Sequence, residues 1–202
     1  MVPLNIFLSH FITDFAFSNV YSEKFLNKKT YYLHLIWAAV VFLSFNFELL
    51  NSKSFYVLIL SFIIHILFDL IRIKKNTTPL FEFIGLIIFF ILNYIFKSHL
   101  EGSFLTNNFQ LYILGLMITT SFLTYIFRIF EIYPREKKDT AGTTERLVIF
   151  IFILSQNFLF AIISGIIGII YKYLFEKFRK KEIILSPILG LIISYIWLII
   201  MK

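Results

Sequence analysis

Ser61–Lys75, SFIIHILFDLIRIKK, is the stretch that decides the fold. It is an apolar run that is interrupted by His65 and Asp69 and closed by basic residues. A helix places residues four apart on one face, so these two side chains lie about one turn apart. Near the start of the chain, His10 and Asp14 repeat the spacing within LSHFITDFAF. Two His-x-x-x-Asp pairs in apolar helices predict a polar site inside a membrane bundle.

The composition assigns the chain to the integral membrane proteins. Of its 202 residues, 59% are hydrophobic and only 15% are charged, whereas a soluble domain carries about 25% charged residues. The absence of cysteine excludes disulfides and thiolate metal sites. The net charge of +7 falls mostly in short loops, so we interpret it as a topology signal and not as affinity for nucleic acid. We expect one transmembrane helical domain over residues 1–202, multi-pass in the cell (inner) membrane, with lipid as its partner; a homo-oligomer is compatible with the sequence.

The apolar segments predict an all-α polytopic bundle. Helix is expected because barrel strands would alternate in polarity and these runs do not. Most segments have the 17–25 residues that a spanning helix needs. The predicted segments are Val2–Val20, Tyr31–Leu50, Ser54–Ile71, Pro79–Phe96, Phe109–Phe130, Leu147–Tyr171 and Ile183–Met201.

Basic residues order these segments across the membrane. The positive-inside rule places the amino terminus outside and the first, third and fifth connections in the cytoplasm. If Leu147–Tyr171 crosses once, 12 basic residues lie inside and 7 outside. If it turns back at Ser155–Asn157 as a re-entrant hairpin, the split becomes 16 and 3. We therefore expect six spans plus a hairpin, with seven straight spans as the alternative, and the two His-x-x-x-Asp segments side by side.

The order of polar motifs resembles a known family. The bacterial membrane proteins grouped as the domain-of-unknown-function 3307 family are similar in His10-x3-Asp14, Lys24, Lys28, His34, His65-x3-Asp69, Gly142-x-x-Glu145-Arg146, Gln156 and Lys172. The resemblance covers nearly the whole chain, and it implies that these His and Asp positions and the Gly-x-x-Glu-Arg turn belong together. The chain departs from the family pattern at Glu82-Phe83 and Leu86, and at Ser186-Pro187.

Buried carboxylates require compensation, which narrows the chemistry. One Asp at the bilayer centre costs about 2.5–3.5 kcal/mol on insertion scales. The carboxylates could be protonated, could bond to His or hydroxyl groups of neighbouring helices, or could bind a divalent cation. As metal ligands we single out His10, Asp14, His65 and Asp69, with His34 nearby. Imidazole and carboxylate ligands leave zinc, manganese and iron as candidate metals.

Three functions follow from these alternatives. The first is a metal-dependent hydrolase or transferase that acts on a lipid-linked substrate from the cytoplasmic side, with Glu82 or Glu145 as base and Arg146 as the clamp for an anionic group. The second is a small proton or ion transporter, or a channel component, in which Asp14 and Asp69 carry the ion. The third is a non-catalytic assembly protein whose buried polar groups only fix helix pairing.

Overall fold

The computed structural model describes residues 2–16, 28–51, 53–75, 79–134, 137–175 and 180–202. Every regular element among these residues is a helix, which confirms the all-α prediction. Lys24, Arg135, Lys177 and Arg179, which enter the predicted charge balance, lie outside the described residues. The chain forms two compact units, Met1–Leu111 and Tyr112–Lys202, and each is described by itself. The single domain over residues 1–202 stays a prediction.

Four helices are long and apolar enough to cross a membrane, which supports a membrane protein. Their ranges are Phe55–Lys74, Asn107–Ile129, Phe158–Phe175 and Lys181–Met201. Two shorter apolar helices cover Lys29–Phe45 and Pro79–Ile95. Large apolar side chains remain exposed on the helix surfaces, including Ile166 and Ile170. Such surfaces are stable against lipid and costly in water.

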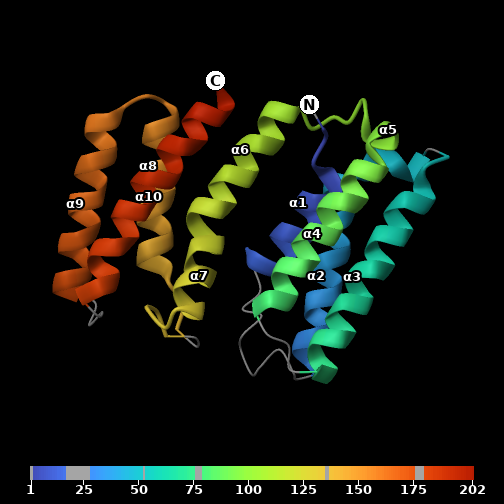
Figure 1. Cartoon of the computed structure of the whole chain (residues 1–202), viewed down its shortest axis with the longest axis horizontal. Helices are drawn as coiled ribbons and strands as arrows, with labels where there is room; N and C mark the ends of the chain where they lie inside the picture. The colour runs from blue at the N-terminus through green and yellow to red at the C-terminus, as the bar shows by residue number, and fades with distance from the viewer. Residues whose placement is uncertain (1, 17–27, 52, 76–78, 135–136, 176–179) are drawn as a thin grey trace. The chain divides into compact units, whose positions relative to one another are not determined.

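Unit 1 is built around its first helix. Its elements are α1 (Asn5–Phe15), α2 (Lys28–Phe45), the 3₁₀ turn η2 (Phe47–Asn51), α3 (Phe55–Lys75), α4 (Pro79–Ile95), α5 (Lys97–Leu100) and the start of α6 (Asn107–Met117). Helix α1 packs against α2, α3 and α4 (Figure 1), and nearly all of its side chains are buried. One apolar cluster joins these helices through Ile6, Phe42, Val57 and Phe89. The contact between α1 and α3 confirms that the two His-x-x-x-Asp segments are neighbours.

Unit 2 contains the rest of α6, the π-helical turn η3 (Ile118–Phe122), α7 (Leu123–Ile129), α8 (Thr140–Leu154), α9 (Phe158–Phe175) and α10 (Lys180–Met201). Helices α8, α9 and α10 pack against one another (Figure 1). Their apolar core includes Ile149, Ile153, Ala161 and Leu198. Because α6 and α7 continue through η3, this turn interrupts a spanning helix without breaking it.

The chain reverses between α8 and α9 at Ser155–Asn157, where the sequence predicts a hairpin tip. Gln156 has φ of 62°, and the N–H groups of Gln156 and Asn157 donate to Ile153 O and Phe152 O. This is a Schellman motif, which satisfies the last carbonyls of a helix and directs the chain away from its axis. Helix α9 alone is long enough to cross a membrane. The depth that the hairpin reaches stays a prediction.

Candidate metal centre

Three helices of unit 1 bring the predicted polar residues to one place. His10 and Asp14 come from α1, His34 from α2, and His65 and Asp69 from α3. All five side chains are buried, with relative exposures between 0 and 6%. The four-residue spacing on α1 and α3 turns both pairs toward the bundle interior, as predicted. Buried ionisable side chains need a compensating partner, which apolar side chains at these positions would not need.

Four ligand atoms converge within this cluster. Asp14 Oδ1, His34 Nε2, His65 Nε2 and Asp69 Oδ2 all lie within 4.8 Å of one another. Asp69 Oδ2 is 3.1 Å from His34 Nε2 and 3.3 Å from His65 Nε2. Asp14 Oδ1 is 3.8 Å from the same nitrogen of His34 and 3.9 Å from that of His65. The group could hold one metal ion.

These distances match a tetrahedral metal site. Ligand bonds of about 2.0–2.2 Å place neighbouring tetrahedral ligand atoms about 3.3–3.6 Å apart. The four nitrogen–oxygen distances lie on both sides of that range. Within the described part of the chain, Asp14 Oδ1, His65 Nε2 and Asp69 Oδ2 are buried without a hydrogen-bond partner. Buried polar atoms nearly always have a partner, so these atoms need either imidazole–carboxylate hydrogen bonds or a cation, and the group could hold one.

Arg72 holds the second oxygen of each aspartate. Its Nη1 donates to Asp69 Oδ1 at 2.5 Å, and its Nη2 donates to Asp14 Oδ2 at 2.6 Å. It also donates to both oxygens of Glu82, at 2.9 and 2.6 Å. The guanidinium therefore orients both aspartates so that their remaining oxygens face the histidines. In the sequence, Arg72 is one of the basic residues that close Ser61–Lys75. Its position three residues after Asp69, on the same helix face, was the available clue.

The charges of the cluster favour a divalent cation. Among the described residues, Arg72 forms ion pairs with three carboxylates, those of Asp14, Asp69 and Glu82. When all four groups are ionised, two negative charges are in excess. A divalent ion removes this excess, and neutral imidazoles can then serve as ligands.

His10 contacts residues that supply the four converging atoms but supplies none of them itself. Its Nδ1 is 3.1 Å from His65 Nδ1 and 3.7 Å from Asp14 Oδ2. Its ring stacks on Phe89, with the centroids 3.9 Å apart. Gly85 leaves room for the ring, because a Cβ there would lie 3.3 Å from His10 Nε2. His10, predicted as a ligand, thus contacts a ligand, whereas His34, predicted as only nearby, supplies one of the four atoms.

Arg146 organises a second buried cluster, in unit 2. Its guanidinium is fully buried and donates to five groups: Thr119 O, Thr120 O, Thr124 Oγ1, Asp139 Oδ2 and Ser186 Oγ. Two of these acceptors, Thr119 O and Thr120 O, belong to the π-helical turn η3. The donors of Arg146 are thus used within the protein. Its contacts do not support the predicted role as a clamp for an anion.

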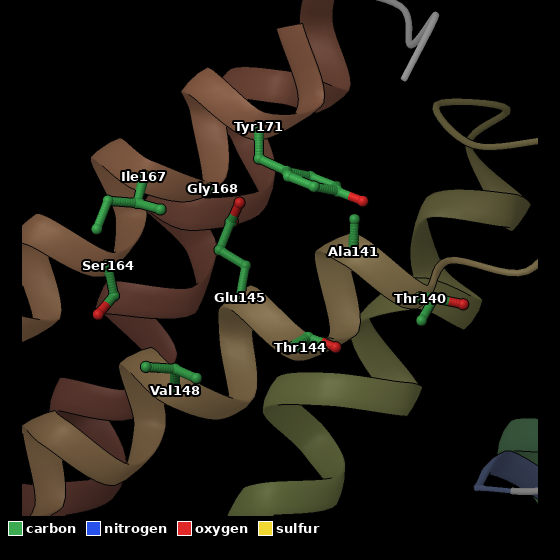
Figure 2. A pocket seen from close by; sticks show the side chains of 9 residues that line it. All are labelled: Thr140, Ala141, Thr144, Glu145, Val148, Ser164, Ile167, Gly168 and Tyr171. Carbon is green, nitrogen blue, oxygen red and sulfur yellow. The ribbon is translucent and has the colours of Figure 1, made fainter. Parts of the chain in front are cut away.

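Glu145 faces a different direction from its neighbour Arg146. Its Oε2 is 2.9 Å from Lys172 Nζ, and its Oε1 accepts from Ser186 at 3.1 Å. It borders a cavity of about 550 Å³ between α8 and α9, and Figure 2 shows its side chain reaching toward Gly168. A Cβ on Gly168 would collide with the carboxylate, so a larger residue there would displace the Glu145 side chain. Both carboxylate oxygens are engaged, and the predicted role of Glu145 as a base stays a prediction.

Asp139 begins α8 and completes the Arg146 cluster. Its Oδ1 accepts from Gly142 N at 3.0 Å as a helix N-cap, and its Oδ2 accepts from Thr124 Oγ1 at 2.7 Å. Burial by itself raises the pKa of this carboxyl, but the charge and hydrogen bond of Arg146 outweigh it, and the net pKa lies below the ordinary value. Asp139 is not among the residues predicted from the sequence, although an Asp directly before a helix start is a capping signal.

The predicted catalytic residues belong to two clusters. Glu82 lies in unit 1 with the metal ligands, and Glu145 and Arg146 lie in unit 2. The chain matches no protein-family model, and searches of curated proteins and of solved structures return no match. The resemblance to the domain-of-unknown-function 3307 family therefore stays a prediction.

Proposed function

We propose that the chain is an integral membrane metalloenzyme that uses one divalent transition metal in a hydrolase or transferase reaction on a lipid-linked substrate. The observation that carries the proposal is the convergence of four buried ligand atoms on Asp14, His34, His65 and Asp69. Two nitrogens and two carboxylate oxygens suit zinc, manganese or iron(II). A set of four protein ligands made of imidazoles and carboxylates favours zinc among these.

The surroundings of the ligands support a substrate that arrives through the membrane. The ligand side chains are buried in a bundle that includes a helix long enough to span a membrane. A lipid-linked group can reach such a site from the bilayer by moving between helices, whereas a water-soluble group must first be desolvated. A bound metal supplies Lewis-acid polarisation and lowers the pKa of a coordinated water. Glu82, with both oxygens bound to Arg72, acts in this proposal as the group that positions Arg72.

A purely structural metal is the second candidate function, and one observation favours it. The protein supplies four ligand atoms, and structural zinc sites are closed by four protein ligands, whereas catalytic sites keep a position open for water. In this case the ion would join α1, α2 and α3 without touching a substrate. The two candidates share the same ligands and differ in whether an external molecule can bind the metal.

Metal content tests the part that both candidates share. Protein purified in mild detergent should carry about one ion per chain. His65→Ala and Asp69→Asn should lose it, because each removes one of four ligands. Glu131→Gln is the matched control, since it removes an exposed carboxylate from unit 2. If the wild-type protein binds neither zinc nor manganese on dialysis, the metalloenzyme proposal is wrong.

Cobalt substitution separates the enzyme from the structural site. Co²⁺ takes up zinc geometries and reports them in its visible absorption. Addition of azide or acetohydroxamate should shift the spectrum if an exchangeable position exists. An unchanged spectrum at saturating additive, together with full metal content, would assign the ion a structural role.

The finer topology is part of the proposal. We place both termini outside, with six spans and the α8–α9 hairpin returning to the cytoplasmic side. The 16-to-3 division of basic residues supports this arrangement. The chain lacks cysteine, so single cysteines at Lys181 and Lys202 can be labelled cleanly. Labelling of both positions from the same side would contradict it.

A further inference from the structure

Unit 1 carries a second polar region at the end opposite the candidate metal centre. A pocket of about 240 Å³ there is lined by Asn5, Asn46, Glu48, His99 and Glu101, among others; we call it the entry pocket. It lies at the start of α1 and beyond the end of α2, whereas Asp14 and His34 lie at the other ends of these helices. Nine residues separate Asn5 from Asp14, which is about 14 Å along a helix.

Asn46 presents an unpaired acceptor to the entry pocket, whereas Asn5 Oδ1 already accepts from Gln110 Nε2 at 2.9 Å. Asn46 Nδ2 donates to Ser9 Oγ and to Phe42 O, each at 2.9 Å. Its Oδ1 is buried and has no hydrogen-bond partner among the described residues. Asn5 Nδ2 likewise donates to Phe45 O and Ser103 Oγ, both at 2.8 Å. The amide donors are therefore used within the protein, and an unpaired oxygen remains at the base of the pocket.

Buried hydroxyls continue this acceptor surface toward the candidate metal centre. Ser9 Oγ donates to Asn5 O at 2.8 Å, and Thr13 Oγ1 donates to Ser9 O at 2.7 Å. On α3, Ser61 Oγ donates to Val57 O at 2.8 Å. Each hydroxyl has one proton, which it donates to its own helix, so these oxygens act toward other groups as acceptors, as Ser9 Oγ does toward Asn46 Nδ2. All three side chains have 0% exposure.

The hydroxyls lie in register with the ligands. Asn5, Ser9 and Thr13 follow one another at four-residue spacing on one face of α1, and Thr13 directly precedes Asp14. Ser61 lies one turn before His65 on α3. Two helices thus carry oxygen acceptors from the level of the entry pocket to the level of the ligands.

We propose that the entry pocket and the hydroxyls of Ser9, Thr13 and Ser61 form the route by which a divalent cation reaches the candidate metal centre. The inference rests on the proposed function and adds how the site is loaded. Oxygen lone pairs replace part of the hydration shell of a cation and repel an anion. Glu48 and Glu101 raise the local cation concentration at the pocket, and none of its described lining residues is Lys or Arg.

Arg72 makes the opposite approach unfavourable. Its guanidinium binds Asp14, Asp69 and Glu82 on the side of the ligands that is away from the entry pocket. A cation arriving there would have to pass a fixed positive charge at short range. The entry pocket has no Lys or Arg among its described lining residues, and it is therefore the end through which we infer that a metal ion enters.

The experiment measures the rate of loading separately from its end point. Metal is removed from the full-length protein with a chelator, Zn²⁺ is added, and bound zinc is followed with time. The double variant Glu48→Gln/Glu101→Gln should load at least about tenfold more slowly, since steering by charge changes association rates by about 10–10³-fold. The single variant Ser9→Val should also load more slowly, because it removes an oxygen acceptor from the route. Both should still reach one ion per chain with the wild-type half-saturation concentration.

Matched variants keep the test specific. Ser44→Val removes a hydroxyl that also donates to its own helix, at Val40 O, but is exposed on α2. Glu131→Gln removes an exposed carboxylate from unit 2. Both should load at the wild-type rate, and circular dichroism should show that every variant keeps its helices. Wild-type loading rates in the double variant overturn the route, and so does an equal slowing in the controls. A wild-type protein that binds no zinc at all refutes the proposed function instead.

Discussion

The two buried polar clusters use similar residues and reach opposite balances of donors and acceptors. In unit 2, the single cation Arg146 is surrounded by five acceptors, so its donors are satisfied within the protein. In unit 1, Arg72 satisfies only one oxygen of each aspartate, and the other oxygens meet two imidazole nitrogens. A cluster whose donors and acceptors match holds helices together. A cluster with acceptors in excess can bind a cation, and this excess distinguishes the candidate metal centre from the structural network.

The largest effect is expected from the satisfied cluster. Arg146→Met leaves Asp139 buried without its ion-pair partner and removes the guanidinium hydrogen bonds to Thr119 O and Thr120 O. Loss of one partner of a buried ion pair typically costs about 3–5 kcal/mol. Thermal unfolding in detergent should show the loss, while Lys138→Met, at an exposed position, should unfold like the wild type. Because all four ligands lie in unit 1, metal content should not change; a loss of metal would break the comparison.

Alanine substitutions at two glycines test how tightly the two clusters are packed. Gly168→Ala places a methyl group against the Glu145 carboxylate, which is held by Lys172 and Ser186. Overpacking of this kind costs about 1–3 kcal/mol. Gly85→Ala meets His10 Nε2 at 3.3 Å, which the ring can accommodate by a small shift. Unfolding temperatures should therefore fall more for Gly168→Ala, and equal losses would contradict this difference in packing.

His10 offers a smaller effect that sharpens the assignment of the ligands. His10→Ala removes the partner of His65 Nδ1 but none of the four converging atoms. Loss of a residue that orients a metal ligand typically reduces affinity by about 10–100-fold. Competition with a chelator of known affinity should give this weakening, whereas His34→Ala should abolish stoichiometric binding. If His10→Ala abolishes binding and His34→Ala does not, the ligand set is the one predicted from sequence.

The smallest expected effect is a dependence on pH in unit 2. The pKa of Asp139 is lower in the folded protein than its ordinary value near 3.8, because Arg146 favours the ionised form against the effect of burial. The ionised carboxylate therefore stabilises the fold above that value, and this contribution is lost as the pH falls toward the folded pKa. Unfolding temperatures between pH 6 and pH 3 should decrease more for the wild type than for Asp139→Asn. Parallel curves would remove Asp139 as the cause.

The sequence by itself determined the class of protein and the faces of its helices. Apolar runs of spanning length predict membrane helices because no other backbone state satisfies its hydrogen bonds in lipid. The four-residue spacing of His65 and Asp69 places both on one helix face through local geometry alone. The reversal at Ser155–Asn157 was also readable, since three polar residues interrupt an apolar segment.

Only the tertiary structure decided which polar atoms meet. His34 has no partner at helical spacing, and it joins Asp14 and Asp69 because α2 packs against both α1 and α3. His10 has the right spacing, yet stacking on Phe89 and the space at Gly85 direct its ring to His65. Arg72 and Arg146 are both basic residues near helix ends in the sequence. Arg72 binds only one oxygen each of Asp14 and Asp69, whereas Arg146 supplies the cation for the one carboxylate that it binds, Asp139. Spacing along one helix sets a face, whereas the distance between atoms of different helices depends on how all the side chains between them pack.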